Sequence, residues 1–211
     1  MSRGERGAYV WDLPTRLFHW ALAASVIGAY ATAEIAPDIT LHMTLGGIAV
    51  GLILFRLMWG FVGGRHARFA SFVKAPAECL RYARALLTGQ GWRLEAGHSP
   101  IGGLATLALI FVVALQAGAG LFANDGVLDE GPLAGFVSSS MSDDLTDLHE
   151  TVIDLLIALV VLHLAAIAFY RLVCGVDLIG AMLFGRNPHL SETATDADAR
   201  GSGVAFAIAG A

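Results

Sequence analysis

The chain has 211 residues, of which 56% are hydrophobic and only 15% are charged, and its mean hydropathy is +0.66. This composition excludes an ordinary soluble domain and predicts one domain of a few membrane helices. The formal charge of −5 excludes little by itself, because the charges are segregated along the chain. The two cysteines, Cys79 and Cys174, are far apart and form no CxxC or CxxCH motif, which argues against a disulfide framework and covalently attached haem.

Four apolar runs are long enough to cross a bilayer, for which about 20 residues are needed. We expect membrane spans at about 16–36, 42–62, 101–123 and 148–173. The segment before the first run is polar and no small-residue cleavage site is present, so we expect a retained span and not a signal peptide. The predicted fold is an all-α, integral membrane four-helix bundle.

The basic residues predict the orientation. With four spans, all thirteen Lys and Arg residues fall on the side of the N-terminus, the middle connection and the C-terminus. The other two connections contain no basic residue, and their acidic residues are Asp38, Asp125, Asp129, Glu130, Asp143, Asp144 and Asp147. The positive-inside rule therefore predicts that both termini are in the cytoplasm.

The middle connection and the C-terminal tail have different compositions. APAECLRYARALL, at 75–87, alternates apolar residues with Arg81 and Arg84, which favours a short helix on the cytoplasmic lipid surface over an irregular basic loop. Residues 190–211 are rich in Ser, Thr, Asp and Gly and are expected to be disordered. The predicted membrane domain therefore covers residues 8–189.

Four histidines lie at two depths of the predicted bundle. His149 and His163 are fourteen residues apart in the last run. Fourteen helical steps of about 100° return to within ~40° of the starting direction, and they span roughly 21 Å. His19 is near the cytoplasmic start of the first run, and His42 is at the outer start of the second. Because neighbouring helices alternate in direction, His19 shares the inner level with His163, and His42 shares the outer level with His149.

Paired imidazoles from facing helices are the ligands that six-coordinate haem iron requires. A zinc site would need more ligands at one level, and a lone membrane histidine can instead bond to a neighbouring helix. Two level-matched pairs favour haem over both alternatives. We therefore predict two haems b, an inner haem bound by His19 and His163 and an outer haem bound by His42 and His149.

Several neighbours of these histidines are candidate cofactor contacts. Gly46, one turn after His42, would let a flat macrocycle approach the backbone, with plain helix packing as the alternative. Arg56 lies near the inner level, where a haem propionate is its expected partner and snorkelling to the interface the alternative. Arg16, one turn before His19, is a second candidate of this kind.

The roles of three other polar residues near the spans stay open. Glu150 and Asp154 follow the outer histidine of the last run and could assist a proton or quinol reaction. The alternatives are an interfacial position for Glu150 and a helix–helix hydrogen bond for Asp154. His98 precedes the third run and has no level-matched partner, so we expect it to be structural or near a propionate, with a quinone site as the alternative.

The chain also resembles the bacterial cytochrome b561 and nickel-hydrogenase b-type cytochrome family. The matching segments are VWDLPTRLFHW at 10–20, LHMTLGGIAVGLILFRLMWG at 41–60, GHSPIGGL at 97–104 and LHETVIDLLIALVVLHLAAI at 148–167. The resemblance implies a four-helix membrane domain with two b-type haems. Carried over to this chain, the family's haem ligands are His19, His42, His149 and His163.

The resemblance implies electron transfer across the membrane between the quinone pool and a redox partner in a respiratory chain. The expected partners are membrane lipid, quinone or quinol, and a periplasmic cytochrome c or oxidoreductase subunit, with no nucleic acid; a homodimer stays open. The alternatives are a superoxide:quinone oxidoreductase that acts alone and a non-redox metal-binding membrane protein. Whether the chain is an enzyme or only an electron carrier is left open by the sequence.

Overall fold

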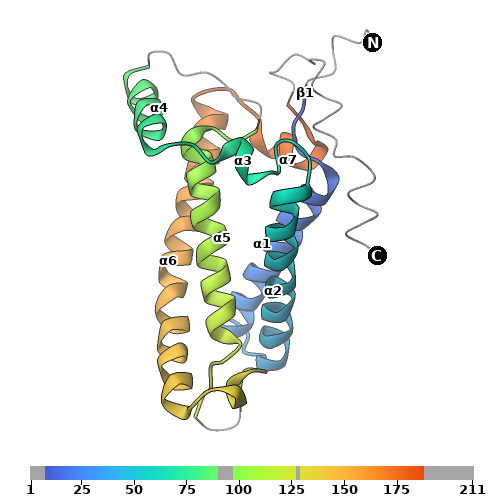
Figure 1. Ribbon diagram of the computed structural model, residues 1–211, viewed down its shortest axis with the longest axis vertical. Helices are drawn as coiled ribbons and strands as arrows, with labels where there is room; N and C mark the ends of the chain where they lie inside the picture. Colours follow the sequence, from blue (N-terminus) through green and yellow to red (C-terminus); the bar gives the residue numbers. More distant parts are fainter. Residues whose placement is uncertain (1–7, 90–96, 127–128, 188–211) are drawn as a thin grey trace. The chain divides into compact units, whose positions relative to one another are not determined.

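The computed structural model describes residues 8–89, 97–126 and 129–187, and these residues are predominantly helical (Figure 1). The four long helices are α1 (Leu13–Glu34), α2 (Ile39–Val62), α5 (Pro100–Gly120) and α6 (Ser139–Leu172). The all-α prediction is confirmed. The tail predicted to be disordered, 190–211, lies outside the described residues.

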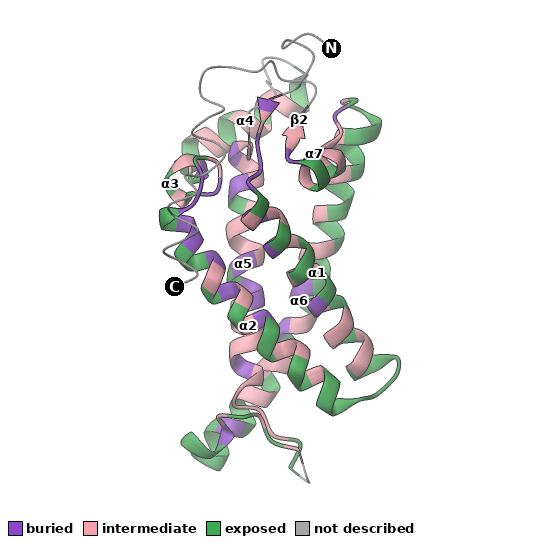
Figure 2. Cartoon of the chain, turned by 90° about the vertical axis from the view of Figure 1, so that its right-hand side faces the viewer, coloured by how far each residue is buried: buried purple, intermediate pink, exposed green. Residues whose placement is uncertain are grey.

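Three of these helices, α2, α5 and α6, are long and apolar enough to cross a membrane, as far as the described residues show. Helix α1 is 22 residues long and covers most of the first predicted span, but His19, Tyr30 and Glu34 lower its hydropathy. The span predicted at 16–36, and with it the total of four spans, therefore stays a prediction. Large apolar side chains on the long helices are exposed in the protein, including Leu54 (59%), Phe111 (66%) and Val161 (60%), as a lipid-facing surface requires (Figure 2).

Short elements connect and flank the long helices. They are α3 (Phe69–Phe72), α4 (Pro76–Thr88), the 3₁₀ helix η2 (Ala134–Phe136), α7 (Leu178–Phe184), and strands β1 (Ala8–Tyr9) and β2 (Arg186–Asn187). The two strands pair antiparallel, with Ala8 opposite Asn187. Helix α4 confirms the helix predicted at 75–87: it begins with a proline and is capped at its C-terminus by Gly89, whose φ of 69° suits glycine. Its place on a lipid surface stays a prediction.

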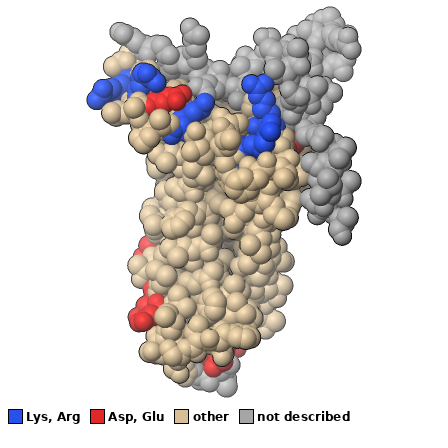
Figure 3. Space-filling model, viewed as in Figure 1, with Lys and Arg blue, Asp and Glu red and all other residues tan. Residues whose placement is uncertain are grey.

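The chain forms two compact units. The first comprises Met1–Leu17, Arg56–Leu107 and His163–Ala211, and the second comprises Phe18–Phe55 and Ala108–Leu162. All thirteen Lys and Arg residues belong to the first unit's segments, and the second unit has none. The basic side chains visible in Figure 3 accordingly lie on the first unit, including those of α4.

A buried carboxylate organises the described part of the first unit. Asp12, which is 2% exposed, accepts hydrogen bonds from the backbone N–H of Thr15 (2.9 Å), the indole Nε1 of Trp59 (3.1 Å) and the backbone N–H of Gly64 (3.1 Å). Asp12 thus caps the start of α1 and ties it to the end of α2. In the second unit, Gly28 lets α1 approach α2, because a Cβ there would lie 2.8 Å from Leu45 Cδ1.

Candidate functional site

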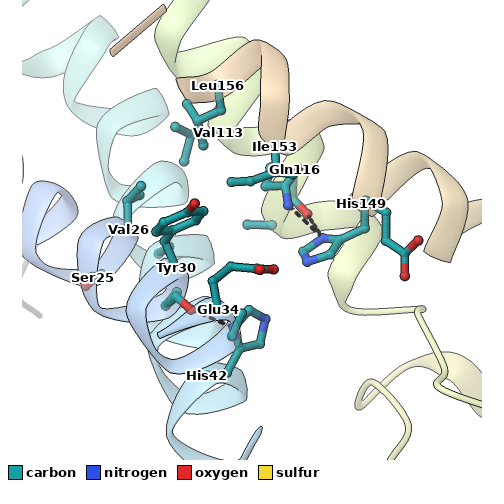
Figure 4. Close-up of a pocket in the computed structure, with 16 residues that line it drawn as sticks. Ser25, Val26, Tyr30, Glu34, His42, Val113, Gln116, His149, Ile153 and Leu156 are labelled. Carbon is teal, nitrogen blue, oxygen red and sulfur yellow. Dashed lines mark hydrogen bonds between the residues drawn. The ribbon is translucent and has the colours of Figure 1, made fainter. Parts of the chain in front are cut away.

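The second unit contains a cavity of about 270 Å³ that is lined by α1, α2, α5 and α6 (Figure 4). Most of its lining is apolar or small. The polar side chains include His42 from α2, Gln116 from α5, His149 and Glu150 from α6, and Glu34 from α1. The structure thus brings together the two histidines that the sequence assigns to the outer level.

His42 and His149 are separated by a distance that suits one shared metal ion. Their ring centroids are 6.0 Å apart and the ring planes are at 85° to each other. An imidazole nitrogen binds a first-row transition metal at about 2.0–2.1 Å, so two imidazoles on opposite sides of one ion have ring centres roughly 6 Å apart. The two side chains therefore fit a single iron between them.

Hydrogen bonds to the backbone orient both rings. The Nδ1 of His42 is 2.9 Å from the carbonyl oxygen of Ala29, and the Nδ1 of His149 is 2.8 Å from that of Gln116. Because a carbonyl oxygen only accepts, each Nδ1 carries the proton and each Nε2 keeps its lone pair. This tautomer is the one that binds a metal through Nε2, and a carbonyl partner fixes the ring and raises its basicity.

The side chain of Gln116 gives a further contact to His149. Its Nε2 is 3.2 Å from His149 Nδ1, while its Oε1 is buried without a hydrogen-bond partner. The oxygen and nitrogen of an amide exchange by a rotation of the group. In the exchanged orientation the amide oxygen accepts from the Nδ1–H, so Gln116 can hold His149 through both its backbone and its side chain.

Two glycines shape the space around the histidines. A Cβ at Gly120 would lie 2.8 Å from Cε1 and 3.0 Å from Nδ1 of His149, so only glycine leaves room for this ring position. A Cβ at Gly46 would meet nothing within 4 Å, although Gly46 lines the cavity. Gly46 therefore lies beside open space, as a contact with a flat macrocycle requires. No sequence pattern marks Gly120 as part of the site.

Two carboxylates line the same cavity. Figure 4 shows the Glu34 side chain pointing from α1 toward the space near His42 and His149, and Glu150 also belongs to the lining. The second unit has no Lys or Arg to balance them. Asp154 is exposed and is not among the lining residues of this cavity, and its role stays a prediction.

The other predicted site residues are divided between the units. His19 belongs to the second unit and His163 to the first, and their pairing stays a prediction from the sequence. Arg16, in the first unit, donates from Nη1 to the carbonyl oxygen of Leu183 at 2.6 Å. Arg56 is 2% exposed, so its guanidinium is inside the first unit and does not reach its surface.

His98 lies among aromatic rings of the first unit. Its ring centroid is 4.7 Å from that of Trp11 and 4.5 Å from that of Phe72. Burial and, to a smaller extent, the positive charge of Arg56 lower the pKa of His98 to about 3. His98 is therefore neutral at physiological pH.

The choice of metal group follows from the number of ligands. Within 8–89, 97–126 and 129–187, no group of three or more His, Cys, Asp or Glu side chains could hold a metal ion. Structural zinc needs four ligands and catalytic zinc needs three from the protein. Haem iron needs only two axial protein ligands in a six-coordinate site. The pair His42 and His149 fits haem better than a protein-only metal centre.

Comparisons with known proteins identify the family of this chain. The family model described as prokaryotic cytochrome b561 matches residues 10–185. The chain is also 23% identical over 214 residues to a protein of Rhizobium leguminosarum bv. viciae named "Probable Ni/Fe-hydrogenase B-type cytochrome subunit", covering 85% of this chain and 88% of the relative. No solved structure matches. The chain belongs to the prokaryotic cytochrome b561 family, whose members are membrane-bound b-type cytochromes that transfer electrons.

Proposed function

We propose that the chain binds two haems b and carries electrons across the inner membrane, between the quinone pool and a redox partner in a respiratory chain. The observation that carries the proposal is the pair His42 and His149, with ring centroids 6.0 Å apart and both Nδ1 atoms bonded to carbonyl oxygens. When bound, haem supplies reversible one-electron chemistry at iron.

The protein's own residues prepare the outer site for this chemistry. The carbonyl groups of Ala29 and Gln116 hold the two imidazoles in the metal-binding tautomer before any ligand is present. Apolar side chains such as Val113, Ile153 and Leu156 line the cavity and would surround a bound haem with apolar groups. A ligand set that is already oriented needs little rearrangement between oxidation states, which favours fast electron transfer.

The second haem is proposed between His19 and His163. Helix α6 runs without interruption from Ser139 to Leu172, so His149 and His163 share one helix and, at fourteen residues apart, one face. His19 lies in the second turn of α1. Arg56 and Arg16 are the basic residues proposed to face this haem.

The orientation and the partner are proposed from charge. The Lys and Arg residues are confined to the first unit's segments, which supports a cytoplasmic location for both termini. The acidic second unit would then attract a basic periplasmic cytochrome c or oxidoreductase subunit. The Rhizobium relative is named as a subunit of a hydrogenase, which supports a partner protein over independent action.

The test is a reduced-minus-oxidised visible spectrum with haem stoichiometry from a pyridine haemochrome assay. The wild type should contain two low-spin haems b per chain. His42→Ala and His149→Ala should each retain one haem, and so should His19→Ala and His163→Ala. His66→Ala, which removes a histidine outside the proposed sites, should retain both. A purified, haem-sufficient wild type without haem would refute the proposal.

A further inference from the structure

The side chain of Gln116 places a buried amide beside the ring of His149, and one atom of this amide is unpaired. Its Nε2 is 3.2 Å from His149 Nδ1, whereas its Oε1 is inaccessible to solvent and has no hydrogen-bond partner among the described residues. A buried amide oxygen without a donor is costly, because it has lost its bonds to water and gained none in exchange. A donor within reach of this side chain is therefore expected.

The backbone carbonyl of the same residue determines which end of the amide faces His149. This carbonyl oxygen lies 2.8 Å from His149 Nδ1 and can only accept, so Nδ1 carries the proton. An amide NH2 group that faces an N–H group opposes two donors and leaves the amide oxygen unpaired. Half a turn of the amide exchanges its oxygen and nitrogen with little change in shape. The exchanged orientation removes both conflicts at once.

Helix α5 holds the His149 ring close to this amide. Gly120 follows Gln116 by four residues and therefore lies on the same face of the helix. A Cβ at Gly120 would be 2.8 Å from Cε1 and 3.0 Å from Nδ1 of His149, so the ring lies almost against the backbone of α5. The Nδ1–H group then has two acceptors from one residue, the backbone oxygen and the side-chain oxygen of Gln116, in a three-centre hydrogen bond.

The ring of His42, on the opposite side of the cavity, is held by fewer acceptors. Its Nδ1 is 2.9 Å from the carbonyl oxygen of Ala29, and within the described part of the chain no side chain bonds to this ring. The two histidines thus share a tautomer but differ in the number of acceptors at Nδ1. Each acceptor at Nδ1–H increases the electron density of the ring and the basicity of Nε2. We therefore expect His149 to be the more strongly donating ligand of the pair.

We propose that Gln116 is a positioning residue for the outer haem: its side-chain oxygen accepts a second hydrogen bond from His149 Nδ1 and thereby lowers the reduction potential of that haem. This inference rests on the proposed function. The oxidised haem carries one more positive charge than the reduced haem, so a ligand with more electron density favours the oxidised form. Gln116 has this effect without a net charge and without contact with the iron.

Two substitutions separate the hydrogen-bond acceptor from the volume of the side chain. Gln116→Met keeps the length of the side chain and removes the acceptor, so the one-electron equilibrium should change at least threefold toward the reduced form, an increase of about 28 mV or more. Gln116→Glu keeps an acceptor and makes it anionic, so the equilibrium should change at least tenfold toward the oxidised form, a decrease of about 59 mV or more. The matched control is Thr106→Val on the same helix. It removes a hydroxyl that bonds to the carbonyl oxygen of Gly102 at 2.9 Å, and it should leave the potential unchanged.

The experiment is a potentiometric titration followed by visible spectra, in a His163→Ala background that leaves only the outer haem. A reduced-minus-oxidised infrared spectrum gives a second readout. The chain has two glutamines, so a Gln90→Ser variant grown with glutamine that carries ¹³C in its side-chain carbonyl has this label at Gln116 alone. The labelled carbonyl band should shift when the haem changes oxidation state, because the hydrogen bond from His149 changes in strength. A side chain that only fills space would give no such band.

Each outcome supports or contradicts a defined part of the reasoning. Potentials of Gln116→Met and Gln116→Glu that equal the control, or an infrared spectrum without a glutamine band, would overturn the inference. If Gln116→Met does not retain haem, the potential of Gln116→Glu and the infrared band decide, because both are measured with an acceptor in place. A His163→Ala parent without haem would instead refute the proposed function, so the two failures are distinguishable.

Discussion

Gly120→Ala should remove one haem while leaving the fold intact. The added Cβ would lie 2.8 Å from Cε1 of His149, which is 0.6 Å inside the 3.4 Å at which ordinary van der Waals contact begins. The ring cannot yield freely, because its Nδ1 is bonded to the carbonyl oxygen of Gln116 at 2.8 Å. Yielding would either lengthen this bond or change the 6.0 Å separation from His42.

The expected loss of affinity follows from these two contacts. Overpacking by one methyl group typically costs about 1–3 kcal/mol. Since every 1.4 kcal/mol is a factor of ten, haem at the outer site should bind roughly 5- to 150-fold more weakly. The matched control is Gly118→Ala on the same helix, where a Cβ would meet nothing within 4 Å.

The assay is haem stoichiometry during dilution or mild detergent washing, together with the low-spin spectrum. We expect Gly120→Ala to fall from two haems per chain toward one, and Gly118→Ala to keep both. Full retention of two haems with an unchanged spectrum in Gly120→Ala would show that His149 is not held in the observed position when haem is bound.

Three further predictions concern the cavity, the buried carboxylate and pH. Gly46→Val should lower outer haem content because its side chain enters the cavity, whereas Gly47→Val, at a glycine outside the cavity lining, should not; equal haem content in both would contradict this. Asp12→Ala should destabilise the protein by about 2–4 kcal/mol in detergent unfolding, because it leaves an indole and two backbone N–H groups buried without an acceptor; a loss below ~1 kcal/mol would count against the observed contacts. The pKa of His98 is lowered from 6.5 to about 3 in the folded protein, so below pH 6.5 the unfolded chain binds a proton that the folded chain does not. As the pH falls from 6 to 4, the free energy of unfolding of the wild type should therefore fall by up to ~1.4 kcal/mol per pH unit relative to that of His98→Asn. Parallel curves of unfolding free energy against pH for the two proteins would refute this.

The sequence was sufficient to predict which histidines of the second unit lie together. Helical periodicity and alternating helix direction determine depth, and these two rules place His42 and His149 at one level. The amphipathic pattern likewise predicted helix α4. Helix α6, in contrast, begins nine residues before the predicted span at 148–173, because its first residues are polar and hydropathy detects only the apolar part of a helix.

The groups that orient the histidines could not be predicted from residue types. The carbonyl oxygens of Ala29 and Gln116 belong to the backbone, and every residue carries the same group. Whether a helical carbonyl is close to a ring on another helix depends on how far one helix is rotated against the next. Gly120 is similar, since a glycine in an apolar run is common and only the position of His149 gives it a role. These features depend on how the helices pack in the folded chain.

The unequal distribution of charge predicts that the two haem sites differ in potential. The outer site has Glu34 and Glu150 in its lining and no Lys or Arg in its unit. Negative charge beside a haem opposes the addition of an electron, whereas a cation such as Arg56 favours it. We therefore expect the haem of His149 to have a lower midpoint potential than the haem of His163, as measured in variants that retain one haem each. Glu34→Gln should raise the lower potential and leave the other unchanged. The opposite order of midpoint potentials, or an unchanged potential in Glu34→Gln, would contradict this reasoning. Either result would mean that solvent or lipid headgroups screen these charges, so that the charges do not favour electron flow from the outer site to the inner one.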